Sequence, residues 1–324
     1  MEKITLGRSG LKVSPICFGT WELGGEWGAV DEKAATAAIH RARELGVNFF
    51  DTAQGYGFGE SEELLGAALA EELRADRDEL VIATKGGLRR EGDRMVRDAS
   101  AQWLREGVDA SLRALGVDAI DLYQVHWPDP ATPFAETASA LAELVDVGKI
   151  HHVGVSNFDA GQMEVFAEHG PLETLQPPYH MFRRGIEDSV LPYCRAHDVG
   201  VLIYGPLAHG LLTGAMSPST EFVADDWRST SSDFAGETFR RNLAVVERLK
   251  QFAIERGVSL PVLAVAWTLA HPAVDVAIVG TRNPDHLIDS VGALDVRLSE
   301  EDLAEIDRIL ADALPVRGPS PEGM

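Results

Sequence analysis

Seven polar residues, spread over much of the chain, stand at or just after the end of short apolar segments. They are Asp51, Lys85, His126, Ser156, Asn157, Gln176 and Tyr204. A carboxylate, an ammonium, an imidazole and a phenol that meet in one place can transfer protons. Any one of them alone is more often a structural histidine or a solvated charge. Their chemistry therefore depends on whether the fold brings them together.

The apolar segments alternate with amphipathic helices, in which apolar residues recur at intervals of three and four. Eight strands are expected, over residues 16–18, 47–50, 80–83, 120–125, 152–155, 172–175, 201–204 and 274–279. Eight strand–helix pairs in this order predict an α/β fold, a single closed (β/α)8 TIM barrel over residues 1–324. The alternative is an open, doubly wound sheet, which usually has fewer strands.

Segments outside these pairs predict additions to the barrel. Residues 4–6 and 11–13 flank a Ser-Gly turn and predict an N-terminal β-hairpin that plugs the barrel floor. Residues 260–270 predict a buried helix, and residues 300–310 predict an extra C-terminal helix. The loop over residues 205–236 is longer than a connection requires, and such loops often act as lids.

A barrel of parallel strands brings the carboxyl ends of all its strands to one face, where catalysis takes place. The seven polar residues would then surround one opening. The last expected strand also ends there, in the segment Gly280-Thr281-Arg282. Seven coincidences at one rim favour a functional site over seven unrelated structural roles.

Composition limits the partners. A formal charge of −22 at pH 7 argues against nucleic acid or an anionic membrane surface, since both require clustered Lys and Arg. No secretory signal or membrane-spanning apolar run is present, so a cytoplasmic location is expected. Cys17 and Cys194 are expected to be free thiols. His151 and His152 are neighbours on a strand and point to opposite faces, so no metal site is expected.

The chain resembles the aldo-keto reductase superfamily from residue 6 to about residue 307. The matching stretches include NFFDTAQGYGFGESEELLG, VIATKGG, DLYQVHWPDP, VGKIHHVGVSNF and YGPLAHGLLTG. The resemblance implies an oxidoreductase that reduces small aldehydes or ketones by hydride transfer. Two alternatives remain, a cofactor-binding regulatory or channel-subunit-like module, since some superfamily proteins serve channels, and a phosphosugar barrel without nicotinamide.

The resemblance assigns a catalytic role to Asp51, Tyr56, Lys85 and His126. Tyr56 would donate a proton to the alkoxide that forms, although a free phenol, with a pKa of about 10, holds its proton tightly. The Lys85 cation would lower that pKa, and Asp51 would hold the ammonium in place. His126 would orient the carbonyl oxygen and donate a hydrogen bond to it as negative charge develops.

The resemblance also implies a site for NADP(H), with NAD possible. The nicotinamide would contact Ser156, Asn157 and Gln176 and stack on Tyr204, unless that ring is a core aromatic. The expected cofactor residues are Gly19, Thr20, Trp21, Asp51, Ser156, Asn157, Gln176, Tyr204, Gly205, Pro206, Leu207, Gly210, Gly280, Thr281, Arg282, His286, Asp289 and Ser290.

At the adenosine end, Arg282 is the expected contact for the 2′-phosphate, because its planar fork suits that group. Family members often carry Ser at the position of Gly205, Arg or Gln at that of His286, and Asn at that of Ser290. The alternative for Arg282 is an ordinary solvated arginine.

Aromatic residues near the expected opening predict an apolar substrate pocket, since carbonyl sites are mostly apolar with a few polar anchors. The expected lining is Trp21, Tyr56, His126 and Trp127. Ordinary packing is the alternative for both tryptophans. No pattern in the sequence indicates an oligomeric state.

Overall fold

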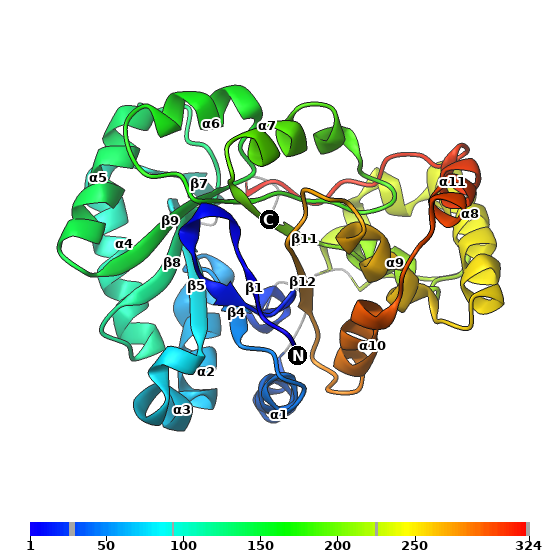
Figure 1. Ribbon diagram of the computed structural model, residues 1–324, viewed down its shortest axis with the longest axis horizontal. Coiled ribbons are helices and arrows are strands. Elements are labelled where there is room, and N and C mark those ends of the chain that lie inside the picture. Colours follow the sequence, from blue (N-terminus) through cyan, green and yellow to red (C-terminus); the bar gives the residue numbers. More distant parts are fainter. Residues whose placement is uncertain (26–29, 93, 224–225, 322–324) are drawn as a thin grey trace.

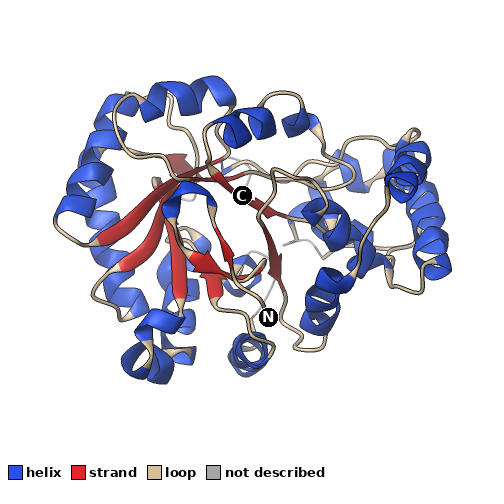
Figure 2. Ribbon diagram, in the orientation of Figure 1, coloured by secondary structure: helices blue, strands red, loops and turns tan. Residues whose placement is uncertain are grey.

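A computed structural model describes residues 1–25, 30–92, 94–223 and 226–321. Eight parallel strands close into a barrel in the order β10-β11-β12-β3-β4-β5-β8-β9 (Figure 2). They are β3 (Ile16–Gly19), β4 (Phe49–Asp51), β5 (Val81–Gly86), β8 (Ile120–Val125), β9 (Ile150–Ser156), β10 (Thr174–Gln176), β11 (Gly200–Tyr204) and β12 (Val276–Gly280). Each overlaps a predicted strand, so the (β/α)8 barrel is confirmed.

Helices surround the barrel: in Figure 1, α1 to α3 lie below the strands, α4 and α5 on the left, α6 and α7 above, and α8 to α11 on the right. They are α1 (Glu32–Glu44), α2 (Glu60–Ala68), α3 (Ala70–Ala75), α4 (Ala101–Leu115), α5 (Phe134–Asp146), α6 (Ala160–Ala167), α7 (Val190–Ala196), α8 (Gly236–Glu255), α9 (Leu260–Leu269), α10 (His286–Gly292) and α11 (Glu300–Leu310). Side-chain caps begin several of them, as at Asp31, Ser100 and Ser299. The predicted extra helix is α11, and the predicted buried helix is α9.

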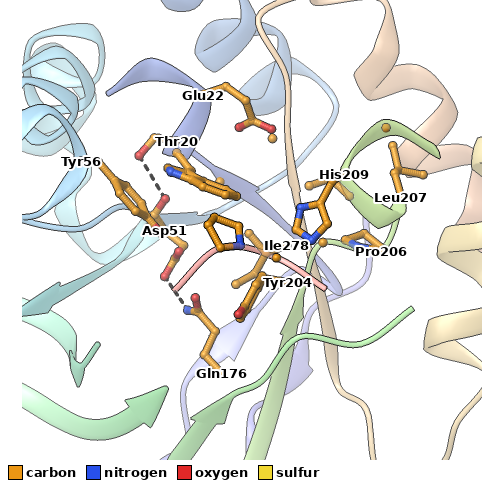
Figure 3. Close-up of a pocket in the computed structure, with 18 of the residues that line it drawn as sticks. Thr20, Glu22, Asp51, Tyr56, Gln176, Tyr204, Pro206, Leu207, His209 and Ile278 are labelled. Carbon is orange, nitrogen blue, oxygen red and sulfur yellow. Dashed lines mark hydrogen bonds between the residues drawn. The ribbon is translucent and has the colours of Figure 1, made fainter. Parts of the chain in front are cut away.

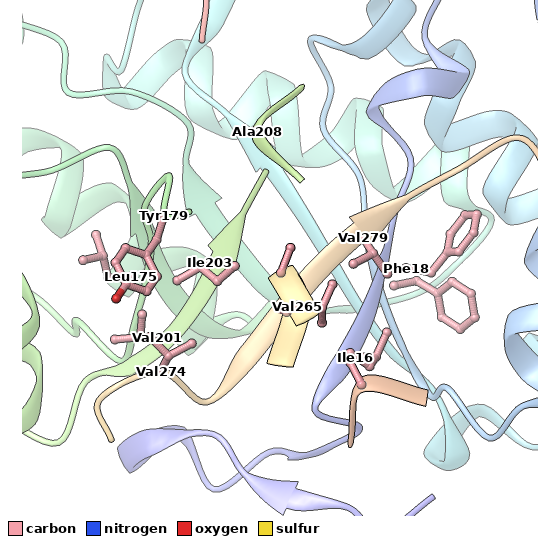
Figure 4. Close-up of a cluster of buried hydrophobic side chains, with 14 of the residues drawn as sticks. Ile16, Phe18, Leu175, Tyr179, Val201, Ile203, Ala208, Val265, Val274 and Val279 are labelled. Atoms are coloured by element: carbon pink, nitrogen blue, oxygen red, sulfur yellow. The ribbon is translucent and has the colours of Figure 1, made fainter. Parts of the chain in front are cut away.

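Alternation along the strands builds two separate cores. Ile16 and Phe18 of β3 face the outer core between strands and helices, whereas Cys17 between them faces the barrel interior. Figure 4 shows part of the outer core, where Val265 of α9 lies among side chains from β3, β11 and β12. Helix α9 is buried on nearly all sides, which is why apolar residues occupy nearly all of its surface.

A short hairpin closes the floor of the barrel. It pairs β1 (Ile4–Thr5) with β2 (Lys12–Val13), and its buried Leu6 and Val13 join the interior core. Gly7 of the hairpin packs directly on Gly200 at the start of β11. A Cβ at Gly7 would lie 2.2 Å from the Gly200 nitrogen, and the φ of Gly7 is +46°, so glycine is required there. The predicted plug is thereby confirmed.

Two features of the barrel mouth differ from the prediction. After β5, β6 (Leu88–Glu91) and β7 (Arg94–Arg97) form an antiparallel hairpin, whereas the sequence indicated only a connection. Its charged residues hide the alternation that marks a strand. The expected lid at residues 205–236 contains three 3-10 turns, η6 (Ala208–Thr213), η7 (Trp227–Thr230) and η8 (Ser232–Phe234). Its residues 224–225 lie outside the described ranges.

Among the described helices, none is by itself both long enough and apolar enough to cross a membrane. Helices α8 and α9 reach that length and apolarity only when taken together, and the chain bends by 89° between them. Cys17 and Cys194 are both buried as free thiols.

Candidate active site

A cavity of about 300 Å³ opens where the strands of the barrel end (Figure 3). Most of the residues predicted for the site line it. These are Gly19, Thr20, Trp21, Asp51, Tyr56, His126, Trp127, Ser156, Asn157, Gln176, Tyr204, Gly205, Pro206, Leu207, Gly210, Gly280 and His286. The structure therefore brings together side chains that lie far apart in the sequence.

Strand register explains this convergence. Asp51, Gln176 and Tyr204 are the last residues of β4, β10 and β11, and His126 directly follows β8. Parallel strands in a closed barrel end at the same level, so these side chains meet at one face. Lys85, one residue before the end of β5, lies behind the cavity wall and is fully buried.

The buried Lys85 is held by an ion pair. Its Nζ donates to Oδ1 of Asp51 at 2.5 Å and to the carbonyl oxygen of Thr52 at 2.8 Å. The other Asp51 oxygen, Oδ2, accepts from Nε2 of Gln176 at 2.9 Å and from Nε2 of Gln124 at 3.3 Å. Charges without water need such partners, because an unpaired buried ion is strongly destabilising. The network fixes the ammonium at one point below the cavity.

Tyr56 lines the cavity and lies close to this ammonium. It begins the turn η3 (Tyr56–Gly59), in which Gly57 and Phe58 have left-handed φ angles of 57° and 51°. The centroid of the Tyr56 ring lies 4.9 Å from Nζ of Lys85 and 5.6 Å from the centroid of the His126 ring. The Trp21 ring stacks on the Tyr56 ring, with 6.4 Å between the ring centroids. A phenol, a cation and an imidazole thus share one corner of the cavity.

The imidazole of His126 is neutral. Burial, and to a smaller extent the Lys85 charge, hold its pKa well below the ordinary 6.5. Its Nδ1 is buried and has no hydrogen-bond partner among the residues that the structure describes. An unpaired buried acceptor is tolerated more readily than an unpaired N–H, so this environment favours the tautomer with the proton on Nε2. That tautomer can donate a hydrogen bond to a bound oxygen.

Amides and a phenol line the side of the cavity formed by β9 to β11. Tyr204 donates from its hydroxyl to Oδ1 of Asn157 at 2.8 Å, and Nδ2 of Asn157 donates to the carbonyl oxygen of His126 at 3.0 Å. Ser156 donates to the carbonyl oxygen of Gln176 at 2.8 Å. Burial raises the pKa of Tyr204 to about 12, so this phenol keeps its proton. The Tyr204 ring can stack on a planar ring of a ligand, while the neighbouring amide groups bind a carboxamide on that ring.

The structure brings only part of the predicted adenosine end to the cavity. His286 lines it, whereas Thr281, Arg282, Asp289 and Ser290 do not. Oγ1 of Thr281 lies 3.3 Å from Nδ1 of His286, and the Ser290 hydroxyl donates to the His286 carbonyl oxygen at 3.3 Å. Asp289 is exposed, and Arg282 is half-buried. Thr281, Arg282, Asp289 and Ser290 therefore lie outside the lining of the cavity, in the segment around His286.

Several lining residues were not predicted. Glu22 lies in the turn after β3, and His209 and Arg228 come from the long loop after β11. Nη1 of Arg228 donates to the carbonyl oxygen of His209 at 2.9 Å, which ties the two ends of that loop together. Gly318 and Pro319 of the C-terminal segment also line the cavity. No local pattern in the sequence marks these residues.

Within the described ranges, no group of three or more His, Cys, Asp or Glu side chains could hold a metal ion. His152 instead contacts Glu173, with 2.9 Å between Nδ1 and Oε1.

Known proteins match this chain over nearly its whole length. The model of the aldo/keto reductase family matches residues 15–311. Aldo-keto reductase YhdN of Bacillus subtilis (strain 168) is 41% identical, over 97% of this chain and 95% of its own. The NADH-specific methylglyoxal reductase of Escherichia coli (strain K12) is 34% identical, over 97% and 99%.

A solved structure agrees with these sequence matches. The glycerol dehydrogenase AKR11B4 from Gluconobacter oxydans has a TM-score of 0.86 at 40% identity, covering 96% of this chain and 95% of that one. The chain belongs to the aldo/keto reductase family, and it is an oxidoreductase of the kind that uses NAD(P)H.

Proposed function

We propose that this enzyme reduces small aldehydes or ketones with NADPH in preference to NADH, with Tyr56 as the proton donor. The observation that carries the proposal is the corner of the cavity where Tyr56 lies close to both the Lys85 ammonium and the His126 imidazole. We also propose a cytoplasmic location, in keeping with the free thiols of Cys17 and Cys194.

The residues around the cavity fit a nicotinamide dinucleotide. Asn157 and Gln176 offer amide groups, and Tyr204 offers a planar ring at the same side. Glycines at positions 205 and 210 leave backbone close to the cavity, which suits the approach of phosphate groups. The bound dinucleotide would supply the hydride.

Proton transfer would then depend on the chain's own residues. Tyr56 would donate its hydroxyl proton to the carbonyl oxygen as that oxygen becomes an alkoxide. The Lys85 cation favours the phenolate that remains, and Asp51 keeps the cation in position. His126 is neutral, so it would orient the carbonyl oxygen by donating from Nε2 rather than by acting as an acid. Solvent would return the proton to Tyr56.

The substrate proposal is limited to small carbonyl compounds. Two relatives are named for methylglyoxal and for glycerol, which are both three-carbon molecules. The tryptophans at positions 21 and 127 give the cavity apolar surface, as expected for a carbonyl pocket.

Tyr56→Phe tests the assignment. The variant keeps the ring and loses the proton donor, so turnover should fall by about 10²–10⁴ while cofactor affinity changes by a few-fold at most. Turnover is measured on a carbonyl panel that includes methylglyoxal, with NADPH and with NADH, and affinity by tryptophan fluorescence. Wild-type turnover in the variant would rule out Tyr56 as the donor. Tight cofactor binding with no turnover in the wild type would favour a binding module instead.

A further inference from the structure

Glu22 is the carboxylate in the cavity for which the proposed mechanism has no role. It belongs to the turn η2 (Trp21–Leu23) and lines the cavity together with Gly280 and His286. In Figure 3, Glu22 and Gln176 lie at opposite sides of the pocket, so Glu22 is remote from the amides expected to hold the nicotinamide. It stands instead at the side where β12 ends.

Contact with the backbone fixes the position of this carboxylate. A Cβ built on Gly280 would lie 1.9 Å from Oε2 of Glu22 and 2.7 Å from Oε1. No other residue type fits at position 280 without moving Glu22. The carboxylate therefore rests on the chain two residues before Arg282, at the segment expected to hold the adenosine phosphate.

The surroundings disfavour the charged form of Glu22. Burial raises its pKa to about 7, opposed by a backbone hydrogen bond within the residue and by the positive charge of Arg282. The other described ionisable residues that share the cavity or lie on elements packed against η2 are Asp51, Tyr56, Glu60, Glu62, Glu63, His126, Tyr204, His209, Arg228 and His286. Among the side chains that the structure describes, the charge of Arg282 is the one that counteracts the effect of burial on the pKa of Glu22.

An anion beside a phosphate site weakens it in two ways. It repels the phosphate directly, and it offsets the field of the cation that attracts the phosphate. NADPH differs from NADH by one phosphate on the adenosine ribose, so a nearby carboxylate affects the two dinucleotides unequally. Glu22 and Arg282 are both half-buried, which makes the effect larger than at an open surface.

We propose that Glu22 determines cofactor selectivity by opposing the 2′-phosphate of NADPH when its carboxylate is ionised, through the charge of Arg282. The inference rests on the proposed function, because it assumes that a nicotinamide dinucleotide occupies this cavity. Protonation of Glu22 removes the opposition. The preference for NADPH over NADH is therefore weaker at pH 8.5 than it would be with a neutral residue at position 22.

The test is fluorescence titration of NADPH and NADH into the wild type and Glu22→Gln at pH 6 and pH 8.5. At pH 8.5 the variant should bind NADPH about tenfold more tightly than the wild type, as expected for removal of one opposing charge, with less than a threefold change for NADH. At pH 6 the two proteins should agree within about twofold. Because the wild type and Glu22→Gln are compared at the same pH, the ionisation state of free NADPH is the same for both proteins.

Further variants make the result decisive. Glu300→Gln removes an exposed carboxylate from the start of α11 and should behave as the wild type. Glu22→Asp keeps the charge and should keep the wild-type pH dependence, and Glu22→Ala replaces Glu22→Gln if that variant does not fold. In Arg282→Ala, adding Glu22→Gln should change NADPH affinity by less than it does alone.

The outcomes separate the two proposals. Equal NADPH affinity of the wild type and Glu22→Gln at pH 8.5 would overturn the role of Glu22. An equal gain for NADH would overturn selectivity as well. If neither dinucleotide bound the wild type, the proposed function itself would fail.

Discussion

The ammonium of Lys85 lies 4.9 Å from the centroid of the Tyr56 ring, and the Lys85 side chain has no exposed surface. The cation therefore acts on the phenol through protein rather than through water. Charge interactions are several times stronger in such surroundings than in solvent. Lys85 also has a fixed partner in Asp51, so its position does not depend on a substrate.

Replacing Lys85 by Met should abolish most turnover, because the phenolate loses its stabilising cation. The pH–rate profile should shift as well, which a purely structural role would not cause. Removing the cation leaves Asp51 buried and unpaired, at a cost of about 3–5 kcal/mol in stability. The double variant Lys85→Met with Asp51→Asn should recover part of that stability without recovering activity. An unchanged profile in an active Lys85→Met enzyme would contradict the assignment.

His126→Ala should lower kcat by about 10²–10³, the effect of removing one donor to a developing negative charge. Since the pKa of His126 lies well below 6.5, its imidazole is already neutral at pH 6. Glutamine is an uncharged donor. The rate should therefore depend on pH in the same way in the wild type and in His126→Gln between pH 8 and pH 6. Steady-state kinetics of both variants over this range provide the check. A change that follows the imidazole would mean that His126 is charged during turnover.

Arg282→Ala should weaken NADPH by about 10- to 150-fold and leave NADH almost unchanged. A hydrogen bond to a charged group contributes roughly 1.5–3 kcal/mol, and only NADPH carries the phosphate. Arg297→Ala, on the surface beyond α10, serves as the control. Equal losses for both dinucleotides would show that Arg282 does not read the phosphate.

Glu22 should make the unfolding free energy of the ligand-free protein fall as pH rises from about 4.5 to about 7. Its pKa is 4.5 in ordinary surroundings and about 7 in the fold, so the folded protein binds the extra proton in this window. The loss is complete above pH 7 and amounts to at most about 3 kcal/mol.

Urea unfolding of the wild type and Glu22→Gln at pH 4.5 and pH 8 measures this term. The variant should gain stability relative to the wild type at the higher pH. Glu301→Gln, an exposed carboxylate in α11, should show no such gain. The same gain at both pH values would mean that ionisation of Glu22 is not the cause.

The barrel could be predicted because each strand carries a strong local signal. Apolar runs such as the one in β8 have the length of a strand and lie between helices with one apolar face. The hairpin of β6 and β7 has no such signal. It is half exposed and carries four arginines. Antiparallel pairing of its two strands across the turn at Gly92 holds it together, rather than burial of apolar side chains.

The site could be predicted where a strand positions it. Asp51, Gln176 and Tyr204 end their strands, and strand ends can be located in the sequence. Glu22 and His209 could not be found in this way, because loop conformation brings them to the cavity. His209 has a φ of 56° and contacts Trp21, a residue nearly two hundred positions away, edge to face. Such proximity depends on the assembled fold.

The contact between Gly7 and Gly200 holds the N-terminal hairpin against the floor of the barrel. Leu6 and Val13 fill that floor, and the cavity opens at the other end, so the proposed cofactor and substrate would enter and leave where the strands end. The closed end is also a region where the stability of the protein can be changed without changing its catalytic activity. Substitutions around the floor would change the melting temperature and leave the kinetics alone, while the loops at the entrance are free to diverge toward new substrates.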